Sequence, residues 1–277
     1  MSTVLVTGGT GDLGSKLVER FAARGDTVRI LSRKPRPDAS ADADPPVGRV
    51  PSPDEWAQGD VETGEGLAEA VAGADLVVHA ATGAGLRPKA DPPGTRNLLA
   101  ACKEAGTPHF FYISIVGIDR VPLPYYKAKL ECEWLIEKSG VPWSNLRATQ
   151  FHSLLDRFLR YGMLPALGRV PFVRLIPKAF KFQPIETGEV ADRMVACASQ
   201  GPSGRLLDIG GPEVLTFGQM AKAWKRATGD RKPIINLPLM GGMAAAFKAG
   251  YNCTPEYADG KMTWPEWLTR KYGSTSR

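Results

Sequence analysis

The chain has 277 residues, 43% hydrophobic and 23% charged, a composition typical of a folded globular protein rather than a disordered one. Its formal net charge of +6 is spread along the sequence without a basic and aromatic cluster, so we expect no nucleic-acid partner. No run of 18 apolar residues occurs, and we expect no membrane span. The N-terminus lacks a signal-peptide pattern and the four cysteines are dispersed, which predicts a cytoplasmic protein without a metal site.

Short β-branched runs alternate with helical patterns through the first half of the chain, as in βαβ units around a parallel sheet. Pro35–Pro53, rich in proline, aspartate and alanine, is expected to be a loop. Strands are predicted at Thr3–Thr7, Thr27–Leu31, Glu55–Gln58, Asp75–Ala80, His109–Ile115 and Trp143–Arg147. Helices are predicted at Gly11–Arg24, Gly66–Ala72, Pro93–Ala105, Pro124–Ser139 and Phe151–Arg160.

The second half has a less regular pattern. Gly162–Lys181 is expected to be irregular, and the elements after it are a helix over Thr187–Ala198, a strand over Arg205–Ile209, a helix over Phe217–Thr228 and a short helix in TWPEWLTRKYG. We therefore predict a single α/β domain over residues 1–277, with a Rossmann-type doubly wound parallel sheet. Residues 1–150 form the cofactor-binding core in this prediction, and residues 151–277 form a small, mixed C-terminal cap on the substrate side.

The segment VLVTGGTGDLG places Gly8, Gly11 and Gly14 directly after the first strand and at the start of a helix. The first glycine permits a tight turn, the second lets the backbone approach a pyrophosphate, and the third lets helix and strand pack closely. The pyrophosphate then lies on free N–H groups at the positive end of the helix. The predicted phosphate loop comprises Gly8, Gly9, Thr10, Gly11, Asp12, Leu13 and Gly14.

The end of the second predicted strand indicates the cofactor. Sites that prefer NAD place an acidic residue there for the ribose 2′-hydroxyl, but no acid occurs before Asp38. Arg33 and Lys34 stand where a 2′-phosphate would lie, which predicts NADP(H); the alternative is that both are solvated loop cations. Asp60 and Val61, after the third strand, are placed near the adenine, although Asp60 would serve equally well as a helix cap.

A candidate catalytic pair lies on the helix predicted at Pro124–Ser139. Tyr125 and Lys129 are four residues apart and share one helix face. A phenol there can donate a proton to a developing alkoxide, while the ammonium favours the phenolate that remains and can bind the nicotinamide ribose. Tyr126 is a rival phenol. Ser114, at a strand end, is placed either to hold a carbonyl oxygen or to cap the following loop.

The remaining histidines and the tail are given other roles. His79 is predicted to be a core histidine, His109 to begin its strand in solvent, and His152 to lie on the substrate side. Trp264 and Trp267 are expected to pack the last helix against the protein.

Six segments follow one another in an informative order: TGGTGDLG (7–14), DLVVHAAT (75–82), GTRNLLAAC (94–102), YISIVG (112–117), YYKAKLECE (125–133) and LRATQFH (146–152). Together they resemble the short-chain dehydrogenase/reductase superfamily, in its extended and atypical branches, and most closely the NmrA-like NAD(P)H-binding subfamily. The resemblance covers essentially the whole chain. It implies that Tyr125 and Lys129 are the family's YxxxK pair and Ser114 its serine. It further implies cofactor contacts from a strand end, Ala80, Ala81 and Thr82, and from a loop near the nicotinamide, Ala148, Thr149, Gln150 and Phe151.

The residues and the resemblance together predict an NADPH-dependent oxidoreductase. Its reaction would be hydride transfer to a carbonyl or another polarised double bond of a small molecule, and the protein would be a monomer or a homodimer. Two alternatives remain open: an NADP(H)-binding redox sensor without turnover, and a sugar-nucleotide epimerase or dehydratase.

Overall fold

The computed structural model describes residues 1–36, 54–82, 90–162 and 172–273, in two compact units. The first unit contains residues 1–114, 124–146 and 191–206. The second contains residues 115–123, 147–190 and 207–277.

The first unit is built on a seven-stranded sheet in the order β3-β2-β1-β4-β5-β6-β9. Its strands are β1 (Thr3–Thr7), β2 (Thr27–Ser32), β3 (Glu55–Gln58), β4 (Leu76–His79), β5 (Phe110–Ile115), β6 (Trp143–Ala148) and β9 (Gly204–Arg205). The strand order reverses direction at β1, which pairs in parallel with both β2 and β4. This reversal is the switch point of a doubly wound fold, outside which ligands bind at the carboxyl ends of the strands. The predicted Rossmann-type α/β fold is therefore confirmed.

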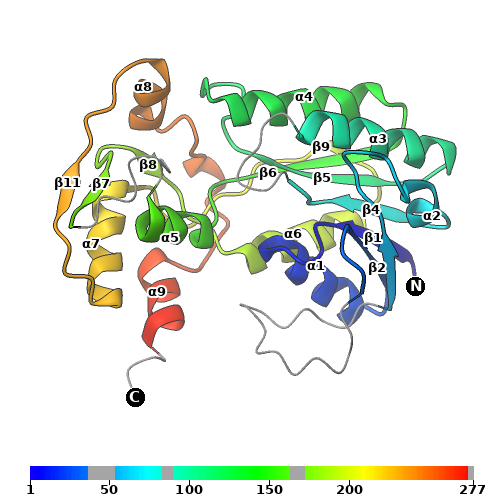
Figure 1. The fold of residues 1–277 in the computed structure, drawn as a ribbon, viewed down its shortest axis with the longest axis horizontal. Coiled ribbons are helices and arrows are strands. Elements are labelled where there is room, and N and C mark those ends of the chain that lie inside the picture. The colour runs from blue at the N-terminus through cyan, green and yellow to red at the C-terminus, as the bar shows by residue number, and fades with distance from the viewer. Residues whose placement is uncertain (37–53, 83–89, 163–171, 274–277) are drawn as a thin grey trace. The chain divides into compact units, whose positions relative to one another are not determined.

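Helices cover both faces of this sheet (Figure 1). α3 (Asp91–Glu104) and α4 (Pro124–Lys138) lie on one face, and α1 (Asp12–Ala23) and α6 (Thr187–Ala198) lie on the other. α2 (Leu67–Val71) is a short helix that contacts α3 and β3. Because both faces are covered, the central strands are apolar runs rather than alternating ones. Val4, Leu5 and Val6 of β1, for example, are completely buried. The buried sheet thus positions the loops at its carboxyl edge.

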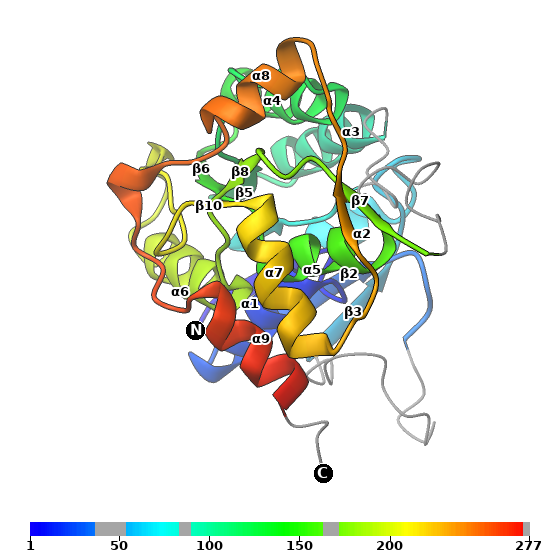
Figure 2. The same cartoon turned by 90° about the vertical axis from the view of Figure 1, so that its left-hand side faces the viewer.

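The second unit carries two small sheets and a group of helices (Figure 2). β8 (Lys181–Phe182) pairs antiparallel with β10 (Leu215–Thr216), and β7 (Arg174–Ile176) pairs in parallel with β11 (Ile234–Asn236). Its helices are α5 (His152–Tyr161), α7 (Phe217–Thr228), α8 (Gly242–Ala249) and α9 (Trp264–Tyr272), with a short 3-10 turn at Pro255–Tyr257. α7 and α9 lie side by side, and each begins in a capping box that satisfies its first free N–H groups.

Asp156 joins three helices of the second unit. Its buried carboxylate on α5 accepts hydrogen bonds from Trp224 Nε1 of α7 at 2.7 Å, and from Lys271 Nζ and the Tyr272 hydroxyl of α9 at 2.8 and 2.5 Å. Asp156→Ala should lower the free energy of unfolding by about 1–3 kcal/mol, because the buried indole N–H would lose its acceptor. Urea denaturation measures this change, with the exposed Glu256→Ala in the same unit as control. If Asp156→Ala lowers the free energy of unfolding no more than Glu256→Ala does, the stabilising role of Asp156 is contradicted.

Most strands and helices predicted for the first unit are present within one or two residues, whereas the second half differs more. The strand predicted at Arg205–Ile209 is shorter, because after β9 only Ile209 forms an isolated bridge, to Ala148. The small strands were not predicted, since two or three residues are too few to show alternation. The eight-residue helix α8 was not predicted either. The prediction for His109 is wrong: it is 5% exposed, hydrogen-bonds with Ser144 Oγ at 2.9 Å, and its burial lowers its pKa to about 4.

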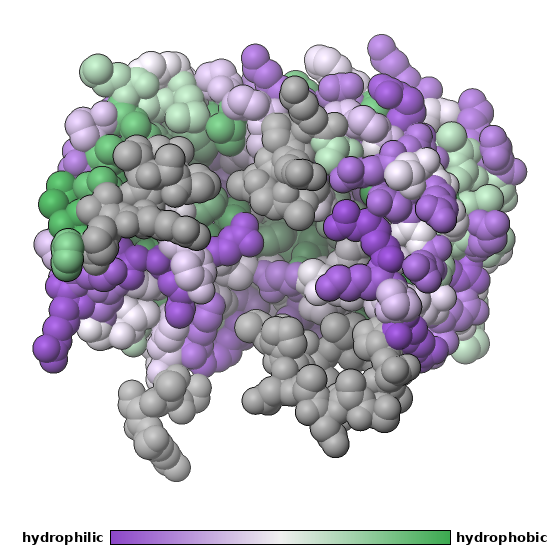
Figure 3. Space-filling model, viewed as in Figure 1, coloured by the Kyte–Doolittle hydropathy of each residue, from purple (hydrophilic) through white to green (hydrophobic). Residues whose placement is uncertain are grey.

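Hydrophobic side chains also reach the surface of the second unit. They gather over α8, the segment that joins it to β11, and β11 itself (Figure 3). Met240 in the joining segment is 90% exposed, and Ile235 in β11 is 45% exposed. Lys248 of α8 donates to the Leu239 carbonyl at 3.0 Å and so fixes this segment to the helix. Within the described ranges, no helix is long and apolar enough to cross a membrane.

Candidate cofactor and active site

The glycine-rich loop after β1 has a shape that requires glycine at two positions. Gly8 has a φ of +70°, and its carbonyl accepts a hydrogen bond from Gly11 N at 2.9 Å. A Cβ on Gly14 would lie 2.0 Å from the Gly8 carbonyl oxygen, and one on Gly8 would lie 2.9 Å from the backbone of Ala81. The loop therefore packs tightly between α1 and the end of β4, as the roles predicted for Gly8 and Gly14 require. The predicted approach of a pyrophosphate to Gly11 stays a prediction.

The N-terminus of α1 is exposed and carries no capping side chain. Gly11 is its N-cap, and no side chain caps the helix there. Thr10, Gly11 and Asp12 are exposed, while Leu13 and Gly14 are buried beneath them. First-turn N–H groups without a capping side chain at the positive end of a helix bind an anion readily. These residues fit the pyrophosphate of a dinucleotide.

Arg33 and Lys34 follow β2 and are both exposed. Both backbone polar groups of Lys34 are hydrogen-bonded. Its N–H donates to Ser32 Oγ at 3.1 Å, and its carbonyl accepts from Trp56 Nε1 at 3.0 Å. Asp38, which follows in the sequence, lies outside the described residues. The two cations thus project from a fixed stretch of backbone directly after the strand.

Asp60 and Val61 shape the turn after β3. The Asp60 carboxylate accepts from Glu62 N at 2.8 Å, and its own N–H donates to the Glu65 carbonyl at 2.9 Å. The helix-cap alternative for Asp60 is therefore wrong, because the N-cap of α2 is Gly66, with no side-chain bond. Val61 packs under α3, where a Cβ added to Gly94 would lie 3.1 Å from Val61 Cγ2.

The end of β4 is fastened to the end of β1. The Ala80 N–H donates to the Thr7 carbonyl and the Ala81 N–H to Thr7 Oγ1, each at 3.3 Å. His79 contacts Thr7 Oγ1 at 2.8 Å and Thr95 Oγ1 at 3.2 Å. Burial, aided by the charge of Lys129, lowers the His79 pKa to about 3, so the ring is neutral. The prediction of a core histidine is confirmed.

The candidate catalytic residues lie in a connected cluster of the first unit. The Tyr125 hydroxyl is 3.1 Å from Thr82 Oγ1, which donates to Asp91 Oδ2 at 2.9 Å. Lys129 Nζ lies 3.2 Å from the same Asp91 oxygen and 5.9 Å from the centre of the Tyr125 ring. Burial acts to lower the pKa of Lys129, but its electrostatic interactions with Tyr112, Tyr125 and Asp91 outweigh it and raise that pKa well above its ordinary value.

The two tyrosines differ in exposure. Tyr125 is half-buried, whereas Tyr126 is only 5% exposed and belongs to the core. Their ring centres are 6.4 Å apart. Tyr125 is thus the phenol of this pair that a ligand can reach with little rearrangement.

Ser114 is almost fully buried near the end of β5, at 2% exposure. Its hydroxyl has no hydrogen-bond partner within the described part of the chain. The alternative that it caps the following loop is therefore not supported there. An unpaired buried hydroxyl costs about 1–3 kcal/mol, so a bound oxygen atom would relieve this cost.

Ala148, Thr149, Gln150 and Phe151 belong to the second unit, and hydrogen bonds within that unit hold them in place. Thr149 Oγ1 accepts from Gly211 N at 3.3 Å. The Gln150 side chain exchanges two hydrogen bonds of 3.1 Å with Asn252. Phe151 is the N-cap of α5. Their predicted contact with a nicotinamide stays a prediction.

His152 is part of an aromatic stack rather than an open surface. Its ring lies parallel to those of Trp264 and Trp267, with centres 5.7 and 5.5 Å away, and it is 1% exposed. The expectation that His152 faces a substrate is therefore not supported by its surroundings. The two tryptophans are 0% and 6% exposed, which confirms that they pack α9 against its neighbours.

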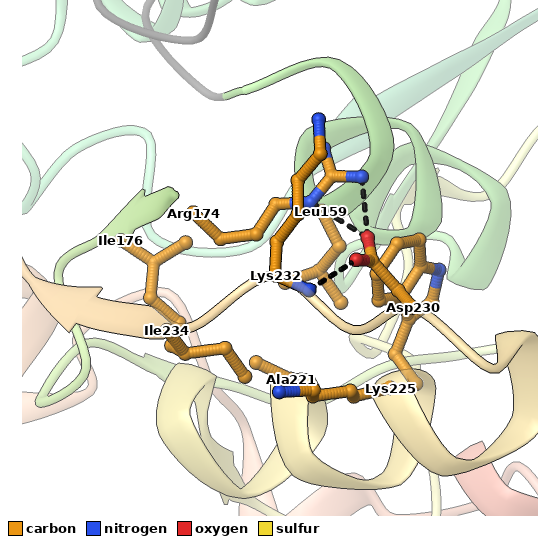
Figure 4. A pocket seen from close by; sticks show the side chains of 9 residues that line it. Leu159, Arg174, Ile176, Ala221, Lys225, Asp230, Lys232 and Ile234 are labelled. Carbon is orange, nitrogen blue, oxygen red and sulfur yellow. Dashed lines mark hydrogen bonds and ion pairs between the residues drawn. The ribbon is translucent and has the colours of Figure 1, made fainter. Parts of the chain in front are cut away.

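A small hollow of the second unit lies between α7, β7 and β11 (Figure 4). Its volume of about 10 Å³ accommodates no more than one water molecule. Asp230 there accepts from Arg174 Nε at 2.9 Å and from Lys232 N at 2.8 Å. The hollow is lined by the ion pair of Arg174 and Asp230 and is too small for a substrate. Among the described residues, no group of histidine, cysteine and acidic side chains is arranged to hold a metal ion.

A family model described as NAD(P)H-binding matches residues 8–156, more than half of the chain. The chain belongs to this NAD(P)H-binding family. This match, together with relatives that are reductases and dehydrogenases, confirms the resemblance to the short-chain dehydrogenase/reductase superfamily. The assignment to the NmrA-like subfamily stays a prediction.

Known proteins similar to this family member carry different activities. A 3-beta-hydroxysteroid dehydrogenase of Mycolicibacterium neoaurum is 34% identical over 125 residues, which are 40% of this chain and 31% of that protein. The chain thus spans less than a third of this curated relative. A UDP-glucose 4-epimerase of Thermotoga maritima shares the fold with a TM-score of 0.71, at 19% identity over 99% of both chains. An NADPH-dependent quinone oxidoreductase of Escherichia coli, solved with NADPH, gives 0.72 at 18% identity over 97% of this chain and 99% of its own.

Proposed function

We propose that this family member is an NADPH-dependent oxidoreductase that reduces a carbonyl or another polarised double bond of a small molecule. The observation that carries the proposal is the cluster of Tyr125, Thr82, Asp91 and Lys129, in which a reachable phenol lies beside a buried, charge-compensated ammonium. Thr82 follows β4, and Ser114 lies near the end of β5. In a doubly wound fold this edge of the sheet is the place where ligands bind.

NADPH, when bound, supplies the hydride. The chain supplies the proton and the orientation: the Tyr125 phenol donates its proton to the carbonyl oxygen while the carbonyl carbon receives the hydride, which yields an alcohol and NADP⁺. The Lys129 ammonium, 5.9 Å from the ring centre, stabilises the phenolate that remains. The unpaired Ser114 hydroxyl supports a second hydrogen bond to the same carbonyl oxygen.

The similar proteins support oxidoreduction without deciding the substrate. The quinone oxidoreductase is named for NADPH and the hydroxysteroid dehydrogenase for an alcohol oxidation, whereas the epimerase is named for another reaction on the same fold. A fold hosts several chemistries, so the cluster around Tyr125, and not the likeness of fold, carries the proposal. A sensor that only binds NADP(H) has no need of a phenol beside a buried ammonium, and this favours turnover.

We further propose that NADP(H) is preferred over NAD(H), because Arg33 and Lys34 follow β2 where an acid is absent. Arg33→Ala should weaken NADPH binding by about 1.5–3 kcal/mol, or roughly 10- to 150-fold, by removing a charged hydrogen bond to the 2′-phosphate. NADH affinity should change little, since NADH lacks this phosphate. Fluorescence titration gives both dissociation constants.

The matched control for this variant is Arg96→Ala, which removes a guanidinium whose side chain is 60% exposed on α3 of the same unit. It should leave both affinities unchanged. Equal affinities of the wild-type protein for NADPH and NADH would contradict the preference, as would equal weakening of both by Arg33→Ala.

A further inference from the structure

Asp91 connects two helices at the candidate active site. It lies in the first turn of α3, where a carboxylate is favoured by the helix dipole, and its side chain is only 3% exposed. α3 and α4 lie side by side (Figure 1), so the carboxylate reaches across to Lys129 of α4. The same oxygen of Asp91 accepts the hydrogen bond of Thr82 at 2.9 Å and lies 3.2 Å from Lys129 Nζ. One buried carboxylate thus contacts two members of the cluster.

The charge of Lys129 depends on this carboxylate. A buried ammonium without a counter-ion is strongly unfavourable. The groups that face Lys129 come from four elements: Asp91 of α3, Tyr112 of β5, Tyr125 and Cys132 of α4, and His79 of β4. Burial raises the pKa values of Tyr112 and Cys132, which keeps both protonated, and His79 is neutral. Among these groups, Asp91 is the one carboxylate.

The direction of the hydrogen bonds follows from the same contact. A threonine hydroxyl has one proton to donate, and Thr82 gives it to Asp91. The contact of 3.1 Å between Thr82 and the Tyr125 hydroxyl therefore has Tyr125 as donor. The carboxylate of Asp91 thereby determines where the phenolic proton points before a substrate arrives.

We propose that Asp91 is the positioning residue of this site, which holds the Lys129 ammonium and orients the Thr82 hydroxyl so that the Tyr125 phenol is kept as a hydrogen-bond donor. The role in turnover rests on the proposed function. Asp91 acts through Lys129 and Thr82 and is assigned no contact with substrate or cofactor. The hold on Lys129 is a property of the protein alone and is measurable without turnover.

The test is Asp91→Asn, which keeps the side-chain shape and an acceptor for Thr82 but removes the charge. The pKa of Lys129 should fall by about 1 unit or more, because the ammonium stays buried and loses its counter-ion. Carbon-13 NMR of the lysine side chains over a pH series measures this, with the Lys129 signal identified by its loss in Lys129→Met. The control is Glu131→Gln, which removes an exposed carboxylate from the same helix and should leave the Lys129 titration unchanged.

Kinetics separate positioning from a purely structural role. In Asp91→Asn, kcat should fall at least 10-fold and decline at a lower alkaline pH than in the wild-type protein, with the dissociation constant of NADPH and the melting temperature close to wild type. Thr82→Val, which removes the hydroxyl and leaves the ion pair, should lower kcat without changing the Lys129 titration.

An unchanged Lys129 titration in folded Asp91→Asn protein would overturn the proposal, whether or not turnover is found. If the Lys129 pKa falls in Asp91→Asn but the wild-type protein reduces no substrate, the role of Asp91 in holding the Lys129 ammonium is supported. The proposed function is then the claim that is contradicted. Asp91→Ser provides a second neutral variant for the same titration. Failure of both variants to fold, while Glu131→Gln folds, would overturn positioning in favour of a structural role.

Discussion

Tyr125→Phe should lower the turnover number by about 10²–10⁴-fold, the usual scale for loss of a general acid. The substitution keeps the ring and its packing near Lys129 and removes only the hydroxyl that lies 3.1 Å from Thr82. NADPH affinity should therefore stay close to that of the wild-type protein. NADPH oxidation with aldehydes, ketones, quinones and enones measures turnover, and fluorescence titration measures binding separately.

Tyr126→Phe is the matched control, because it removes a neighbouring phenolic hydroxyl from a side chain that is only 5% exposed. Its turnover should remain near that of the wild-type protein. If Tyr126→Phe is the inactive variant and Tyr125→Phe is active, the proton donor has been assigned to the wrong tyrosine. If neither loses activity, a phenolic acid takes no part in the reaction.

Gly11→Val should abolish saturable NADPH binding while the protein remains folded. Gly11 is exposed at the N-cap of α1 with a φ of −82°, a conformation open to any residue. Of the atoms in the described segments, a Cβ there would meet only the Gly8 carbonyl oxygen, at 3.2 Å, so a small shift accommodates it. The branched side chain would then occupy the space at the open helix end that a pyrophosphate needs. Fluorescence titration and circular dichroism report binding and fold.

Substitutions at two other glycines serve as comparisons for Gly11→Val. Gly242→Val is the control, because Gly242 is also exposed at a helix start and a Cβ there would lie 3.7 Å from Pro122. Binding should be normal in that variant. Gly14→Ala should destabilise the protein as well as the loop, since its Cβ would lie 2.0 Å from a backbone oxygen. Normal NADPH binding by folded Gly11→Val protein would show that the pyrophosphate does not lie at this helix.

The sequence predicted those features that local pattern determines. The glycine spacing, the apolar strands of the first unit and the helix that carries Tyr125 and Lys129 are all readable from neighbouring residues. The short strands β7, β8, β10 and β11 were not readable, because each contains only two or three residues and depends on its partner strand.

Asp91 was missed for a different reason. In the sequence it is an acid before two prolines, which signals the first turn of a helix and nothing more. Its role becomes visible only when α3 and α4 pack together and bring the carboxylate to Lys129. The prediction for His109 was wrong for a similar reason. A histidine at the end of a strand is expected to be exposed, and only the folded structure shows the buried Ser144 hydroxyl that hydrogen-bonds with it.

The central claim, hydride transfer from NADPH to a polarised double bond, is tested most directly by isotope transfer. The protein is incubated with NADPH that carries deuterium at both C4 positions of the nicotinamide and with the aldehydes, ketones and enones of the panel, and the products are examined by mass spectrometry. The account predicts an alcohol or saturated product that carries one deuterium at the reduced carbon, with Tyr125→Phe forming far less of it. Tight NADPH binding with no deuterium in any product of the panel would contradict the claim and favour a protein that senses the cofactor.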